Sequence, residues 1–209
     1  MNKLEFGNPD ANIVLIQMVD EHDLEGIKNE VALISKNAKT DFRLVALKIN
    51  NWNNDLSPWQ APAVFGKEDF GGNADAALKE VLSLCTDCSK AYYIGGYSLA
   101  GLFALWAAYQ TDIFEGVAAA SPSIWFPGFV DYMEKSNMKA SKVYLSLGDK
   151  EEKARNPVMA TVGDAIRMAH VLLQNKQIVT TLEWNPGNHF RDPDIRTAKA
   201  FSWVMTQNA

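Results

Sequence analysis

The sequence predicts a three-layer α/β fold built on a mostly parallel sheet of about six strands. Six short apolar runs have the composition of buried strands: NIVLIQMV (12–19), FRLVALKI (42–49), AYYIGG (91–96), GVAAAS (116–121), KVYLSLG (142–148) and IVTTLEW (178–184). Several runs are apolar throughout rather than alternating, which is typical of strands covered on both faces of a parallel sheet. Segments with helical periodicity separate them, and this alternation favours helices on both faces of the sheet.

The intervening helices are predicted from apolar residues that recur on one face. Two such faces consist of Leu24, Ile27, Val31 and Ile34, and of Ala74, Ala77, Leu78, Val81 and Leu82. The pairs Asn156-Pro157 and Asp192-Pro193 each combine an N-cap residue with proline at the first helical position. They predict the starts of the last two helices, the first of which spans residues 157–175.

Length and composition indicate a single globular domain over residues 1–209, with no segment typical of a linker. Apolar residues make up 47% of the chain and charged residues 22%, which is an ordinary globular composition. The net charge is −5 without a basic cluster, which argues against nucleic acid as a partner. No run approaches the ~18 apolar residues of a membrane span, and MNKLEFGNPD lacks the apolar core of a signal peptide. We therefore expect a cytoplasmic protein without a membrane span.

Cys85 and Cys88 form a lone C-x-x-C pair. A zinc site would need two further ligands at similar spacing, and the chain has no other cysteine. A thioredoxin-type redox pair opens a helix, whereas this pair ends the predicted helix ALKEVLSLCTDC. We interpret the pair as two free thiols, one of them buried.

The segment YYIGGYSLAGLFALWAA (92–108) predicts a strand, a tight corner and a helix. A dinucleotide fingerprint would need G-x-G-x-x-G and a P-loop would need Gly-Lys-Ser/Thr, and neither is present. The remaining candidate is a nucleophile elbow, G-x-S-x-G, in which a strained serine, here Ser98, projects its hydroxyl above the sheet edge. Gly96 and Ala100 supply the small residues on either side. The alternative is that Ser98 only caps the helix at a tight turn.

A nucleophilic serine of this type needs an acid and then a histidine later in the chain. His189 lies in the turn-rich loop NPGNHFRDP before the last helix and is the candidate base, whereas His170 lies inside a predicted helix. The strand KVYLSLG leads into carboxylates at Asp149 and Glu151. We favour Glu151 because a carboxylate beyond the turn reaches across to the next loop, and Asp149 is the alternative.

These segments resemble the α/β-hydrolase superfamily, and within it the esterase group that includes enterochelin esterases, S-formylglutathione hydrolases and mycolyltransferases. The matching pieces are GGYSLAGLFALWAA, SPSIW (121–125), LGDKEE and GNHF, which span residues 92–190. The resemblance implies an α/β-hydrolase fold without a cap domain, in a chain that begins at the third strand of the full fold, without its first hairpin. In such enzymes the acid often stands three residues past a glycine at the strand end, which adds weight to Glu151. Ala100 departs from the commoner glycine.

The predicted chemistry is acyl transfer on a small-molecule ester or thioester, with Ser98 as nucleophile, His189 as base and Glu151 as the orienting acid. The oxyanion would be held by the Leu99 N–H and by a second N–H after the first strand, from Asp20 or Glu21. This mechanism calls for no cofactor and no metal ion.

The irregular stretch 50–72 is long enough to indicate a functional loop, and its four aromatic residues argue against disorder. We expect the substrate pocket, suited to an apolar or aromatic group, to be lined by Tyr97, Trp125, Trp59, Trp52, Phe190 and His22. The alternative for Trp52, Trp59, Phe65 and Phe70 is that they anchor the loop to the body of the protein. Two alternatives keep the same fold. One is an acyltransferase that passes the acyl group to an acceptor other than water, and the other is a binding module without catalysis.

Overall fold

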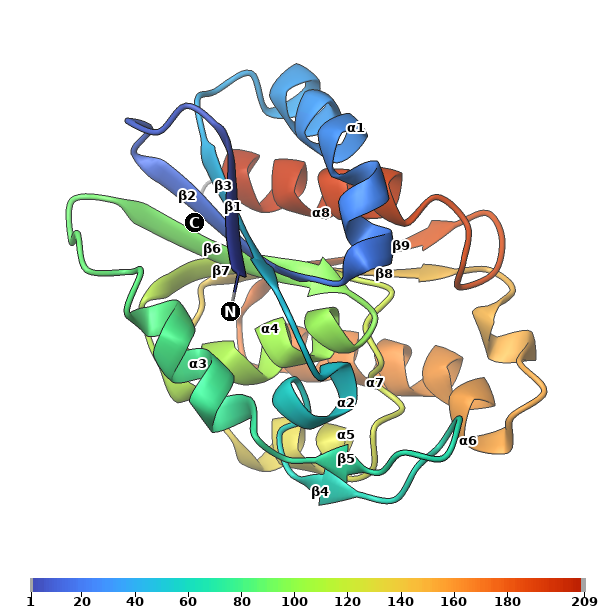
Figure 1. The fold of residues 1–209 in the computed structure, drawn as a ribbon. Helices are drawn as coiled ribbons and strands as arrows, with labels where there is room; N and C mark the ends of the chain where they lie inside the picture. The colour runs from blue at the N-terminus through green and yellow to red at the C-terminus, as the bar shows by residue number, and fades with distance from the viewer. Residues whose placement is uncertain (1, 208–209) are drawn as a thin grey trace.

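The computed structural model describes residues 2–207 and arranges them in three layers around a seven-stranded sheet (Figure 1). The strands of this sheet are β1 Asn2–Gly7, β2 Ile13–Val19, β3 Arg43–Lys48, β6 Ala91–Tyr97, β7 Phe114–Ala120, β8 Lys142–Gly148 and β9 Val179–Asn185. Their order is β1-β3-β2-β6-β7-β8-β9. All neighbouring pairs are parallel except β1 and β3. The predicted fold class and the six predicted strands are confirmed.

The edge strand β1 is an additional element. The first strand predicted from the sequence, residues 12–19, is the second strand of the chain, because β1 precedes it and pairs antiparallel with β3. Lys3 and Glu5 alternate with Leu4 and Phe6, and only Phe6 is even partly buried. Charged side chains on an edge strand discourage pairing with other chains. They also interrupt the apolar run that would have marked the strand in the sequence.

Helices cover both faces of the sheet (Figure 1). On one face, α1 Glu21–Ala38 and α8 Pro193–Thr206 lie side by side. The other face carries α3 Ala74–Leu82, α4 Leu99–Gln110, α5 Phe129–Lys135 and α7 Val162–Asn175. The shorter helices are α2 Trp52–Asp55, α6 Pro157–Ala160 and the 3-10 turn Glu151–Lys153. Within residues 2–207, no helix has the length and apolarity that crossing a membrane requires.

Both predicted helix starts at proline are confirmed, but the first of these helices is shorter than predicted. The Asn156 side chain accepts the N–H groups of Val158 and Met159, as an N-cap does, but α6 ends at Ala160 and α7 begins two residues later. Residues 157–175 therefore form two helices rather than one. Asp192 is the N-cap residue of α8 and Pro193 its first residue, as predicted, although Asp192 has a left-handed backbone with φ of 53° and its side chain makes no capping bond.

The core forms two apolar layers, one on each face of the sheet. On β2, Val14, Ile16 and Met18 contribute to the layer shared with α4, while Leu15 and Val19 contribute to the layer under α1 and α8. Every residue of α4 from Leu99 to Tyr109 is buried. Because α4 is covered on all sides, its N-terminal end is fixed at the carboxyl edge of the sheet, directly after Ser98.

The segment 50–72 is ordered rather than irregular. It contains α2 and an antiparallel pair formed by β4 Gln60–Ala61 and β5 Phe70–Gly71. Phe70 is fully buried and contacts the rings of Trp125 and Phe126. The aromatic residues of this segment thus attach it to the body of the protein.

The C-x-x-C pair follows α3. Both cysteines are free thiols, with Cys85 buried and Cys88 exposed, which confirms the prediction. Burial raises the pKa of the Cys85 thiol to about 12, so a reactive thiolate is disfavoured at this position.

Candidate active site

Ser98 occupies a strained corner between β6 and α4. Its backbone angles, φ 58° and ψ −121°, are rarely adopted by a residue with a side chain. The Ser98 N–H donates to the Ala120 carbonyl at 3.1 Å, which ties the corner to β7. A Cβ on Gly96 would lie 2.6 Å from the Ala100 Cβ, so glycine is required at position 96. The methyl group of Ala100 fits at the position where this elbow more often has glycine.

The structure brings Ser98, His189 and Glu151 together from three separate strand ends. His189 Nε2 lies 3.0 Å from Ser98 Oγ, and His189 Nδ1 lies 2.6 Å from Glu151 Oε2. Ser98 follows β6, Glu151 follows β8 and His189 follows β9, so the parallel strands deliver all three to one edge of the sheet. We call this arrangement the serine–histidine–glutamate chain. Its geometry allows the imidazole to take the serine proton while the carboxylate holds the ring.

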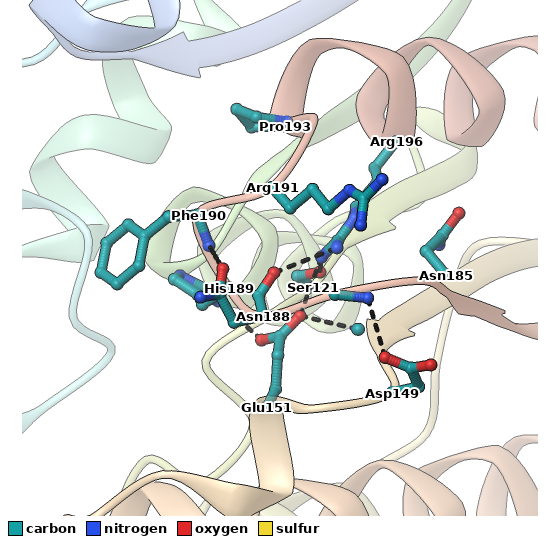
Figure 2. A network of polar contacts seen from close by, with 12 residues as sticks. Ser121, Asp149, Glu151, Asn185, Asn188, His189, Phe190, Arg191, Pro193 and Arg196 are labelled. Atoms are coloured by element: carbon teal, nitrogen blue, oxygen red, sulfur yellow. Dashed lines mark hydrogen bonds and ion pairs between the residues drawn. The ribbon is translucent and has the colours of Figure 1, made fainter.

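The two candidate carboxylates have different partners (Figure 2). Glu151 is buried, and its Oε1 accepts the Gly148 N–H at 2.7 Å while its Oε2 contacts His189. Asp149 Oδ1 instead accepts the Gly187 N–H at 2.7 Å, which braces the turn before His189. Burial raises the pKa of Glu151, but the hydrogen bond and charge of His189 and the Gly148 N–H outweigh burial and hold that pKa below its usual value.

A buried arginine that the sequence analysis did not single out lies behind Glu151 (Figure 2). Arg196, on the first turn of α8, is 1% exposed and its Nη1 donates to Glu151 Oε1 at 3.0 Å. Its position was detectable in principle. Arg196, Ala200 and Val204 recur at a spacing of four residues, so the arginine falls on the buried face of an amphipathic helix.

Ser98 opens onto a cavity of about 150 Å³, and a second cavity of about 130 Å³ lies beyond His189. Of the predicted pocket residues, Trp52, Tyr97 and His22 line the first cavity, Trp125 lines the second, and Phe190 lines both. Phe190 is 81% exposed and therefore presents a free aromatic face. Among the described residues, no group of three or more His, Cys, Asp or Glu side chains is arranged to hold a metal ion.

The prediction that Trp59 lines the pocket was wrong. Its indole packs against Phe126 and Phe129, and its Nε1 donates to the Pro127 carbonyl at 3.0 Å. Trp59 thus anchors the 50–72 segment on the loop before α5, and it lines neither of the two cavities. The sequence shows an aromatic residue near the site but not the direction of its side chain.

The N-terminus of α1 faces the first cavity and includes the two expected oxyanion donors, Asp20 and Glu21. The Asp20 N–H donates to Asp23 Oδ2 at 3.1 Å, and the Asp23 N–H returns a bond to Asp20 Oδ1 at 2.8 Å. This capping box engages the Asp20 N–H, so the expectation that Asp20 supplies an oxyanion donor was wrong. Glu21, the first residue of α1, is left as the candidate from this loop, together with Leu99 at the start of α4.

Known proteins resemble this chain in structure rather than in sequence. No family model matches it, and a sequence comparison with curated proteins finds no match. An IroE-like serine hydrolase from Shewanella oneidensis superposes with a TM-score of 0.76 at 14% identity, over 96% of this chain and 74% of that chain. The siderophore hydrolase EstB from Aspergillus nidulans gives 0.67 at 15% identity, over 96% and 93% of the two chains. An α/β serine hydrolase homologue from Coxiella burnetii gives 0.61 at 15% identity, over 99% and 91%. The chain therefore has the α/β-hydrolase fold.

Asp23 is a partly buried carboxyl group at the first cavity. Burial and the adjacent Asp20 carboxylate raise the pKa of Asp23 to about 7, against the lowering effect of the Asp20 N–H. The ordinary pKa of an aspartate side chain, which we take for the unfolded chain, is 3.8. Between these two values the folded state binds more protons than the unfolded state, so this group lowers the stability as the pH rises through that window.

We predict that Asp23→Asn makes the stability less dependent on pH. Asparagine keeps an acceptor oxygen for the Asp20 N–H but carries no charge. The free energy of unfolding of the variant minus that of wild type should therefore be larger at about pH 8 than at about pH 4.5 in denaturant titrations. Glu25→Gln, an exposed position on the same turn, is the control. The same difference between Asp23→Asn and wild type at both pH values would contradict the prediction.

Proposed function

We propose that the protein is a serine hydrolase that cleaves a carboxylic ester or thioester through an acyl-enzyme on Ser98. The serine–histidine–glutamate chain, with its contacts of 3.0 and 2.6 Å at a strained corner, is the observation that carries the proposal. The α/β-hydrolase fold and the names of its structural neighbours, which are serine and siderophore hydrolases, support the same class of reaction.

In the first half of the reaction, Ser98 Oγ attacks the carbonyl carbon while His189 Nε2 accepts the serine proton. Glu151 Oε2 holds the Nδ1–H and stabilises the imidazolium that forms. The negative charge that develops on the carbonyl oxygen is stabilised by the N–H groups of Leu99 and Glu21, which begin α4 and α1. Each donor of this kind is worth about 3 kcal/mol of transition-state stabilisation. The imidazolium then protonates the alcohol or thiol that leaves.

In the second half, water attacks the acyl-enzyme. His189 takes a proton from the water, the carbonyl carbon is again attacked, and collapse of the tetrahedral intermediate releases the carboxylic acid. The proton returns to Ser98 Oγ, so the enzyme regains its starting state.

The two cavities beside His189 suit the two sides of a scissile bond. The first opens in front of Ser98 and the second lies beyond the imidazole, with the exposed ring of Phe190 lining both. We propose a small-molecule ester with an apolar or aromatic group that packs on Phe190 and Trp125.

We predict that Ser98→Ala lowers kcat/KM for short p-nitrophenyl esters by about 10³-fold or more, because the nucleophile is lost. Steady-state kinetics and thermal unfolding measure both effects, and the stability should be little changed. Ser123→Ala removes the hydroxyl 3.2 Å from Ser98 Oγ and should cost less than about tenfold. A wild type without ester hydrolysis, or a Ser98→Ala variant within about tenfold of wild type, would contradict the proposal. A product that is mainly the transesterified ester rather than the free acid, at a low concentration of added alcohol, would identify an acyltransferase instead.

Exchange of the two acidic side chains for amides separates their roles. Glu151→Gln keeps the size of the side chain but favours the wrong imidazole tautomer, so kcat should fall by about 10³- to 10⁴-fold. Asp149→Asn keeps the acceptor for the Gly187 N–H and should retain kcat within about threefold. Circular dichroism and unfolding curves serve to verify that both variants fold. The opposite ranking of the two variants would make Asp149 the acid.

A further inference from the structure

Arg196 contacts the loops that carry all three members of the serine–histidine–glutamate chain. Its guanidinium lies 3.0–3.2 Å from five acceptors: the two N–H groups of Nη1 are shared among Glu151 Oε1, Tyr97 Oη and Ser121 Oγ, and Nη2 donates to the Pro186 and Asn188 carbonyl groups. These acceptors follow or end four neighbouring strands, β6, β7, β8 and β9. One side chain therefore joins the four strand ends from which the site is built.

The contacts fix the loop that carries His189 on both sides of the histidine. Arg196 Nη2 holds the carbonyl groups of Pro186 and Asn188, and Tyr97 Oη donates to the His189 carbonyl at 2.7 Å. Tyr97 Oη itself accepts a hydrogen bond from Arg196 Nη1. The backbone around the imidazole is thus tied directly or through one hydroxyl to the same guanidinium.

The contacts also fix the orientation of the Glu151 carboxylate. Arg196 and the Gly148 N–H both bind Oε1, which leaves Oε2 directed at His189 Nδ1. The titratable groups that face this carboxylate are His189, Arg196 and Tyr97. Burial and the Glu151 charge raise the pKa of Tyr97 to about 12, so near neutral pH the tyrosine contributes no charge.

We propose that Arg196 is a positioning residue for this site, and that it acts in two ways. Its planar donors set the geometry of Glu151 and of the His189 loop, and its charge offsets the Glu151 charge beside the imidazole. The proposal rests on the proposed function, because both effects concern proton transfer from Ser98.

Arginine suits this position better than lysine. The guanidinium is planar, stays charged when buried and offers donors in several fixed directions. A lysine ammonium keeps the charge but has three donors at one nitrogen, so it cannot reach the acceptors on all four strand ends. Lysine at position 196 therefore separates the charge of the residue from its geometry.

The test compares Arg196→Lys and Arg196→Met in the full chain, with Arg191→Met as the matched control. Arg191 lies in the loop directly before α8, but its side chain is 59% exposed and pairs with Asp192. For each variant, kcat and KM for a p-nitrophenyl ester are measured across the pH range, and unfolding curves give the folded fraction. Arg196→Met leaves Glu151 buried without its counter-ion and can prevent folding. In that case Arg196→Lys, which keeps the charge, still tests the proposal.

For Arg196→Lys we expect kcat to fall by about 10- to 100-fold with KM little changed, and the acid limb of the pH profile to stay in place. For Arg196→Met we expect a larger loss, with the acid limb moved to higher pH by about one unit. Arg191→Met should remain within about twofold of wild type.

Three results would overturn the positioning role. The first is a folded Arg196→Lys variant with kcat within about threefold of wild type. The second is a folded Arg196→Met variant whose acid limb does not move. The third is a loss of activity that matches the loss of folded protein. A wild type that hydrolyses no ester is a different result, visible before any variant is made, and it would remove the proposed function itself.

Discussion

Two adjacent glycines at the end of β6 allow both helical layers to approach the sheet where the candidate site lies. A Cβ on Gly95 would lie 2.7 Å from the Phe201 ring of α8 and from the Ala118 Cβ of β7. A Cβ on Gly96 would lie 2.6 Å from Ala100 of α4. Close packing therefore leaves no room for a side chain at either position. Ser98 occupies the turn into α4 with its backbone strained and its hydroxyl free to meet His189.

The same close approach places α8 against the strand ends. Its first turn carries Arg196, which is fully buried only because α8 packs directly on β6, β7 and β8. A buried guanidinium needs charged or polar partners to offset the loss of its hydration. Glu151 and the carbonyl groups of the His189 loop supply them. Helix α8 is thus held against the sheet in two ways, by the packing of Phe201 on Gly95 and by the polar contacts of Arg196 at the strand ends.

The parts of the fold that were predictable are those with a local signal. Continuous apolar runs identified six strands, and the small residues around Ser98 identified the corner. Strand β1 had no such signal because its charged residues alternate with apolar ones on an exposed edge. The candidate site followed from the order of Ser98, Glu151 and His189 in the chain, since parallel strands place successive carboxyl ends side by side.

The remaining features depend on side-chain directions and long-range contacts. The five acceptors of Arg196 lie 8 to 99 residues away in the chain, and no local pattern predicts that they converge. Trp59 has the composition of a pocket residue, but its indole is held by the Pro127 carbonyl. The hydrogen bond of the Asp20 N–H was predictable from the sequence, because Asp20 and Asp23 have the spacing of a capping box.

The nucleophilicity of Ser98 is the claim on which the proposed chemistry depends, and covalent labelling tests it without knowledge of the substrate. The folded protein is treated with a fluorophosphonate probe, digested, and mapped by mass spectrometry. A single label on Ser98, absent after prior unfolding, is the expected result. A label on another residue, or an unlabelled Ser98 in folded protein, would contradict the assignment of Ser98 as the nucleophile.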